Sequence, residues 1–150
     1  METIFQAYSV QLLRESSGTY QLDPDIVLNS AKRVVGIVNS AYNLQNLTQE
    51  NVILLTADTK LKCVGLYVVH VGSIGQSMFY IPDIFKRVLL SNSERFFLIH
   101  NHPSGDSTPS QEDLAATSRV LDASRVMGID FVDHIVVGYN DHTSIRENTD

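Results

Sequence analysis

The stretch His100-Asn101-His102-Pro103-Ser104-Gly105-Asp106-Ser107-Thr108-Pro109-Ser110-Gln111-Glu112-Asp113 decides the fold of this chain. It follows the apolar run 96–99, which is typical of a buried strand, and it leads into a segment with helical spacing of apolar residues. Histidines two positions apart on an extended backbone point to the same side. The intervening Gly, Pro and Ser residues favour a loop that folds back and brings Asp113 towards both imidazoles. The stretch therefore predicts a strand, a loop and a helix that meet at one point.

A zinc site is the chemistry that this stretch predicts. His100, His102 and Asp113 offer two imidazole nitrogens and one carboxylate. Three protein ligands leave the fourth tetrahedral position open, which is typical of a catalytic rather than a structural zinc site. Iron, manganese or nickel could bind the same donors, but zinc is the metal that we expect. The single cysteine, Cys63, excludes a cysteine-based zinc cage and an internal disulfide, and we expect it to pack as a small apolar side chain.

The spacing of these residues resembles the JAMM (MPN) metalloprotease motif. That motif has His-x-His-Pro, seven residues between the second histidine and a serine, and an aspartate three positions later, as at Ser110 and Asp113 here. The form His-Asn-His-Pro-Ser-Gly resembles the RadC-like bacterial branch. The resemblance extends over roughly 47–147, about two thirds of the chain. It implies an α/β fold with a mixed, curved β-sheet flanked by helices, akin to the cytidine-deaminase-like architecture.

The resemblance also implies an enzyme. Its members include metallopeptidases and isopeptidases that cleave an amide bond with a zinc-activated water, so we expect a peptide or protein substrate. The family supplies a glutamate base from a distant strand, and Glu50, at the head of the apolar run 52–55, takes that position here. A carboxylate at the mouth of a strand is more commonly just solvated. Glu112 is a poorer candidate for the base because it points about 100° away from Asp113 around the helix.

Two polar positions leave alternatives open. Ser110 matches the serine that hydrogen-bonds the carbonyl oxygen as it gains negative charge, yet either Thr108 or Ser110 also fits a helix N-cap. We favour the catalytic role for Ser110. Asp133 and His134 also match the family, and His134 is either a core side chain or a support for the metal ligands.

A non-enzymatic module on the same fold is the rival hypothesis, acting in partner binding or as an accessory in DNA repair. The chain has 17 acidic and 11 basic residues and a net charge of −6. Its basic residues are scattered singly, so charge does not support nucleic-acid binding. The sequence does not indicate an oligomeric state.

We expect one RadC-like JAMM domain over 1–150, with an N-terminal strand and helix in 1–46 and the metal-site core in 47–147. We expect no signal peptide and no membrane span, hence a cytoplasmic protein. The predicted strands are 8–14, 52–55, 61–71, 77–80, 96–100, 131–137 and 142–145. The predicted helices are 24–41, with Asp23 as N-cap and Pro24 at its first position, 82–90 and 110–127.

Overall fold

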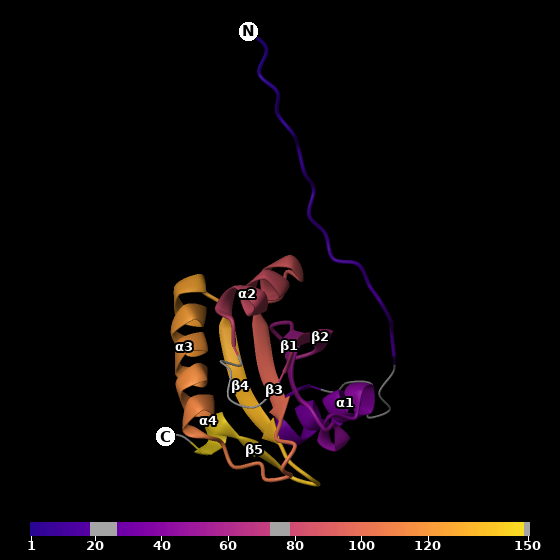
Figure 1. Cartoon of the computed structure of the whole chain (residues 1–150), viewed down its shortest axis with the longest axis vertical. Coiled ribbons are helices and arrows are strands. Elements are labelled where there is room, and N and C mark those ends of the chain that lie inside the picture. Colours follow the sequence, from indigo (N-terminus) through magenta and orange to yellow (C-terminus); the bar gives the residue numbers. More distant parts are fainter. Residues whose placement is uncertain (19–26, 73–78, 149–150) are drawn as a thin grey trace.

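The computed structural model describes residues 1–18, 27–72 and 79–148. Within these residues a mixed sheet has the strand order β2-β1-β3-β4-β5 (Figure 1). The strands are β1 (Glu50–Ala57), β2 (Cys63–Gly72), β3 (Arg95–Asn101), β4 (Asp130–Val137) and β5 (His142–Ser144). The helices are α1 (Ala31–Tyr42), α2 (Ile81–Leu90), α3 (Gln111–Met127) and α4 (Ile145–Asn148), with a 3-10 turn η1 (Leu44–Asn46). The parallel pair β3–β4 and the antiparallel pairs around it confirm the predicted mixed α/β class.

Helices cover both faces of the sheet. Ile53 and Leu55 of β1 pack in the core formed with α1, whereas Val52 and Leu54 pack with α2 and α3. All four side chains are fully buried, as the alternation of a strand between two helical layers requires. Each contributes about 1.5–3 kcal/mol of stabilisation relative to an exposed position. Figure 1 shows α1 and α3 on opposite sides of the sheet.

The antiparallel pairing of β1 with β3 brings distant parts of the chain together. Val52 lies opposite His100, so the start of β1 meets the end of β3. The loop after β3 then leads directly into the first turn of α3. The start of β1, the end of β3 and the N-terminus of α3 therefore converge at one end of the sheet.

A bulge in β4 changes which of its side chains face α3. The pairing with β3 steps from Phe96–Phe131 to Phe97–Asp133 and skips Val132. Phe131 lies in the core shared with α2 and α3, and the extra residue turns His134 to that same face.

The N-terminal part of the chain differs from the prediction. The strand predicted over 8–14 is wrong, because residues 1–18 are exposed and have no regular secondary structure. Alternating apolar residues form a strand only when a sheet edge pairs with them. Among the described residues, β2 and β5 pair on their inner sides with β1 and β4 and not with this segment.

The first helix also begins later than predicted. Asp23 and Pro24 lie outside the described residues, and α1 starts after Ser30, whose side chain accepts a hydrogen bond from the backbone N–H of Arg33. The backbone N–H of Leu28 bonds to the carbonyl of Leu61 in the β1–β2 turn, which places Leu28 outside the helix.

Three smaller predictions are also corrected or left outside the structure. The strand predicted over 77–80 falls mostly outside the described residues, and Phe79 and Tyr80 are not in a strand. In the helix predicted over 82–90, the apolar side chain of Leu89 is 50% exposed rather than packed in the core. Cys63, predicted to pack as an apolar side chain, is exposed. In the described ranges no helix has the length and apolar character needed to cross a membrane.

Candidate metal centre

Two histidines and an aspartate converge where β3 and α3 meet. The Nε2 atoms of His100 and His102 are 3.1 Å apart. The carboxylate of Asp113 lies against both, with Oδ1 3.3 Å from Nε2 of His100 and Oδ2 3.1 Å from Nε2 of His102. His100 and Asp113 are almost completely buried, and His102 is 19% exposed in its side chain. The structure thus brings together the three side chains that the sequence predicted as metal ligands.

The spacing of these donor atoms fits a tetrahedral zinc site. Zinc–nitrogen and zinc–oxygen bonds of about 2.0–2.1 Å at tetrahedral angles separate neighbouring donors by about 3.3 Å. The Nε2 atoms of His100 and His102 are 3.1 Å apart, Oδ1 of Asp113 is 3.3 Å from the first and Oδ2 is 3.1 Å from the second. Two imidazoles and one carboxylate at this spacing can hold a metal ion, and they are donors that zinc accepts.

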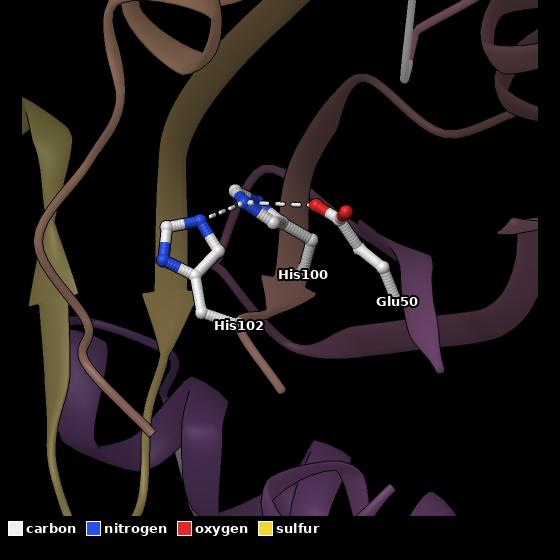
Figure 2. A group of neighbouring side chains, drawn as sticks. All are labelled: Glu50, His100 and His102. Carbon is white, nitrogen blue, oxygen red and sulfur yellow. Dashed lines mark hydrogen bonds and ion pairs between the residues drawn. The ribbon is translucent and has the colours of Figure 1, made fainter. Parts of the chain in front are cut away.

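Glu50 reaches the same point from β1. Its Oε1 lies 3.7 Å from Nε2 of His100, and its side chain is only 12% exposed. Figure 2 shows Glu50, His100 and His102 pointing towards one another. Donor atoms of these three residues all lie within 4.8 Å of one another, close enough to bind a metal ion. Two ligand sets are thus geometrically possible, one completed by Asp113 and one by Glu50.

The carboxylate of Asp113 is held ionised. Burial raises its pKa, but the neighbouring imidazoles of His100 and His102 and the backbone N–H of Ser110 lower the pKa well below its usual value. The hydrogen bond to Asp113 raises the pKa of His102 in turn.

Ser110 caps α3. Its Oγ accepts a hydrogen bond from the backbone N–H of Asp113 at 3.0 Å, and the Asp113 carboxylate accepts one from the backbone N–H of Ser110 at 2.8 Å. This capping box orients the Asp113 carboxylate. Thr108 bonds to Asp106 instead. The Ser110 hydroxyl accepts one bond as a cap and keeps its own proton for another acceptor, so the two roles are chemically compatible. Its catalytic role stays a prediction.

The loop between β3 and α3 holds His102 in place. Gly105 has φ +89°, a conformation that favours glycine, and its backbone N–H bonds to the carbonyl of His102. Nδ1 of His102 lies 2.8 Å from the carbonyl oxygen of Asp106. Because a carbonyl only accepts, Nδ1 carries a proton, so that the neutral form of His102 presents the lone pair of Nε2 to the site.

Asn101, between the two histidines, was not singled out from the sequence. Its Oδ1 accepts from the backbone N–H of Asn51 at 2.7 Å, and its Nδ2 donates to the carbonyl of Gln49 at 2.9 Å. It therefore holds the backbone on both sides of Glu50. The alternation of side chains along β3 places Asn101 on the face opposite His100. This pattern predicts from the sequence that Asn101 does not bind the metal, but it does not predict which groups Asn101 contacts.

His134 supports the site from β4. It is 1% exposed, its Nε2 is 2.7 Å from Nδ1 of His100, and its Nδ1 is 2.6 Å from Oγ1 of Thr117. Of the two roles that the sequence left open for His134, this contact favours support of a metal ligand. Thr117 was missed, although it follows Asp113 by one helical turn and so lies on the same face of α3.

The comparison with known proteins identifies the family. A model of the RadC-like JAB domain matches residues 28–150. The chain belongs to the RadC-like JAB family. Its mixed sheet and flanking helices agree with the JAB/MPN fold, so the resemblance drawn from the histidine motif is confirmed.

Several bacterial members of this family are similar to the chain. The UPF0758 protein of Roseiflexus castenholzii is 39% identical over 104 residues, which are 69% of this chain and 45% of that protein. The UPF0758 proteins of Desulforamulus reducens and Clostridium beijerinckii are 32% and 36% identical, over 81% and 84% of this chain and 52% and 54% of their own lengths. This RadC-like chain therefore spans about half the length of the curated relatives it matches.

Proposed function

We propose that this RadC-like domain is a zinc-dependent hydrolase that cleaves an amide bond in a peptide or protein. The observation that carries the proposal is the convergence of Glu50 with His100, His102 and Asp113 at one buried point. A carboxylate that is 12% exposed and faces two imidazoles has lost most of its hydration, and a bound cation would compensate for that loss. A purely structural role does not require a fourth acidic or basic group beside three metal donors.

The residues divide the chemistry between them. His100, His102 and Asp113 would hold the zinc, which supplies an acidified water and electrophilic stabilisation of the scissile carbonyl. The Glu50 carboxylate would accept the proton of the attacking water and then return it to the leaving amine. The Ser110 hydroxyl would donate its proton as a hydrogen bond to the carbonyl oxygen as negative charge develops there.

The rival function, a partner-binding or DNA-repair accessory module, has weaker support. The net charge of −6 opposes contact with a phosphate backbone. Such a module also gives no use to the buried carboxylate of Glu50 beside His100. The hydrolase is therefore the function that the geometry favours.

A paired substitution tests the proposal. The zinc-loaded protein is incubated with a mixed library of peptides and isopeptide-linked peptides, and mass spectrometry identifies new termini. Glu50→Gln should keep the zinc and lower turnover by about 10²–10⁴-fold, the usual contribution of a general base. Glu112→Gln, an exposed glutamate next to Asp113, is the matched control and should leave turnover unchanged.

Two outcomes would count against the hydrolase. Turnover that persists in Glu50→Gln would remove Glu50 from the role of base. If the wild-type protein binds zinc but no library cleavage depends on it, the amide-hydrolase proposal fails and the binding module becomes the better hypothesis.

A further inference from the structure

A series of hydrogen bonds, buried at His100 and His134 and partly buried at Thr117, runs behind the metal centre, on the side away from the lone pairs of the ligands. Nδ1 of His100 meets Nε2 of His134 at 2.7 Å. Nδ1 of His134 meets Oγ1 of Thr117 at 2.6 Å, and Thr117 donates to the backbone carbonyl of Asp113 at 2.7 Å. These hydrogen bonds therefore link His100 to the backbone of Asp113 through the side chains of His134 and Thr117.

The donor and acceptor in each hydrogen bond of this series follow from the last acceptor, the backbone carbonyl of Asp113. The Asp113 carbonyl can only accept, so the single hydroxyl proton of Thr117 points to it. The Thr117 oxygen must then accept from Nδ1–H of His134. The two ring nitrogens of His134 meet His100 and Thr117 and no carboxylate, so a single proton on the ring satisfies both contacts.

Neutral imidazole carries one proton, so Nε2 of His134 is an acceptor. Nδ1 of His100 must therefore donate to it, which leaves the lone pair of His100 on Nε2. That atom faces His102, Asp113 and Glu50.

We propose that Thr117 and His134 are positioning residues that fix His100 in the tautomer whose Nε2 can bind a cation. A ligating histidine usually donates a hydrogen bond from its second ring nitrogen to a carboxylate, a backbone carbonyl or a water. The carboxylate and the carbonyl can only accept, and a water can turn to accept. His102 follows that rule through the carbonyl of Asp106. His100 instead meets a second histidine, whose nitrogens can each donate or accept, so the Thr117 hydroxyl decides the orientation of the whole chain.

The packing around His134 removes the competing arrangements. The Phe79 ring lies edge-on to the His134 ring with centroids 5.0 Å apart, and His134 is 1% exposed. Water therefore does not replace Thr117 as the partner of Nδ1 without displacing buried side chains. The bulge at Val132 brings His134 to this face of β4.

Thr117→Val tests the proposal, with Thr117→Ser as the matched control. Valine keeps the branched shape of threonine but removes the hydroxyl, while the backbone bonds of α3 stay in place. In Thr117→Val the His134 proton can move to Nε2, which drives the His100 proton onto its own Nε2 and blocks the metal-binding lone pair. Serine keeps the hydroxyl and should keep the wild-type arrangement.

Two readouts are needed, one of which requires no metal. Long-range ¹H–¹⁵N spectra of the metal-free proteins report which nitrogen of His100 carries the proton. We expect Nδ1–H in the wild type and in Thr117→Ser, and a shift towards Nε2–H in Thr117→Val. Zinc affinity, measured by competition with a chromophoric chelator, should fall about 10–100-fold in Thr117→Val, the usual cost of losing such support. It should be unchanged within error in Thr117→Ser.

The outcomes separate this inference from the proposed function, on which its metal-binding consequence rests. A wild-type spectrum with the proton on Nε2 of His100 overturns the inference directly, even if Thr117→Val fails to fold. An unchanged tautomer or an unchanged zinc affinity in folded Thr117→Val also overturns it. A wild-type protein that binds no zinc overturns the proposed function instead, while the spectra of the metal-free protein still decide the tautomer.

Discussion

The choice between the two possible ligand sets can be made from thermal stability alone. We predict that Asp113→Asn abolishes stabilisation by zinc and leaves the helix cap in place, so that the metal-free protein loses only the interaction of the carboxylate charge with the two imidazoles. Asparagine has the shape of aspartate, and its amide oxygen can still accept the backbone N–H of Ser110, the 2.8 Å bond that completes the helix cap. It lacks the negative charge that lies 3.1–3.3 Å from the two imidazole nitrogens. The substitution therefore separates the metal from the cap.

The size of the effect follows from linkage between binding and folding. At a free zinc concentration 100 times Kd, a ligand that binds only the folded state contributes about 2.7 kcal/mol. For a chain of this length about 1 kcal/mol shifts Tm by about 2–4 °C, so zinc should raise the Tm of the wild type by about 5–11 °C. In Asp113→Asn the shift should vanish at the same concentration.

Differential scanning fluorimetry with zinc and with chelator measures the Tm of the metal-free protein and the Tm shift caused by zinc. The Glu50→Gln variant, measured in parallel, completes the test. If Glu50 is the base, Glu50→Gln keeps the zinc-induced shift. The reasoning is refuted if Asp113→Asn keeps the full shift while Glu50→Gln loses it. The ligands would then be Glu50, His100 and His102, and Asp113 would serve only as the cap of α3.

Two further substitutions separate the roles of other side chains. Ser110→Ala should lower the free energy of unfolding in urea by about 1 kcal/mol and Ser110→Gly by only a few tenths, since glycine is a tolerable N-cap. Both should lower peptide turnover by about 10²–10³-fold because both lack the hydroxyl, and a Ser110→Gly variant with full turnover would show that Ser110 is a cap alone. Asn101→Ala should cost about 1–3 kcal/mol, because it leaves two backbone groups beside Glu50 without their partner. It should also reduce turnover more than zinc affinity, and equal losses in the two measurements would contradict the role given to Asn101.

The convergence of His100, His102 and Asp113 could be predicted because the geometry that joins them is local. A strand, a glycine-containing loop and a capped helix lie within residues 100–113, and their spacing alone fixes how Asp113 returns to the histidines. The same holds for the hairpin of β1 and β2, which a short turn connects. Glu50 was reached only through the family resemblance, since it comes from a strand 50 residues earlier.

His134 was named only through its match to the family, and its contacts and the role of Thr117 could not be derived from the local sequence because their partners are set by tertiary structure. His134 meets His100 only because β3 and β4 pair in parallel and β4 has a bulge at Val132. Neither feature can be predicted from the spacing of apolar residues in the sequence. The predicted strand over 8–14 failed for a related reason. Its alternating pattern is compatible with a strand, but a strand is stable only when a neighbouring edge supplies its hydrogen bonds.

The order of residues at the end of β3 couples the base to the metal ligands. His100 and His102 face α3, and Asn101 between them faces the opposite way and holds the backbone on either side of Glu50. A displacement of this short segment therefore moves the donors and the carboxylate of Glu50 together. The 3.7 Å between Oε1 of Glu50 and Nε2 of His100 is consequently held by Asn101 in addition to the pairing of β1 with β3. Proton transfer is sensitive to such a distance, so a site assembled from segments 50 residues apart gains precision from the asparagine that reinforces the strand pairing.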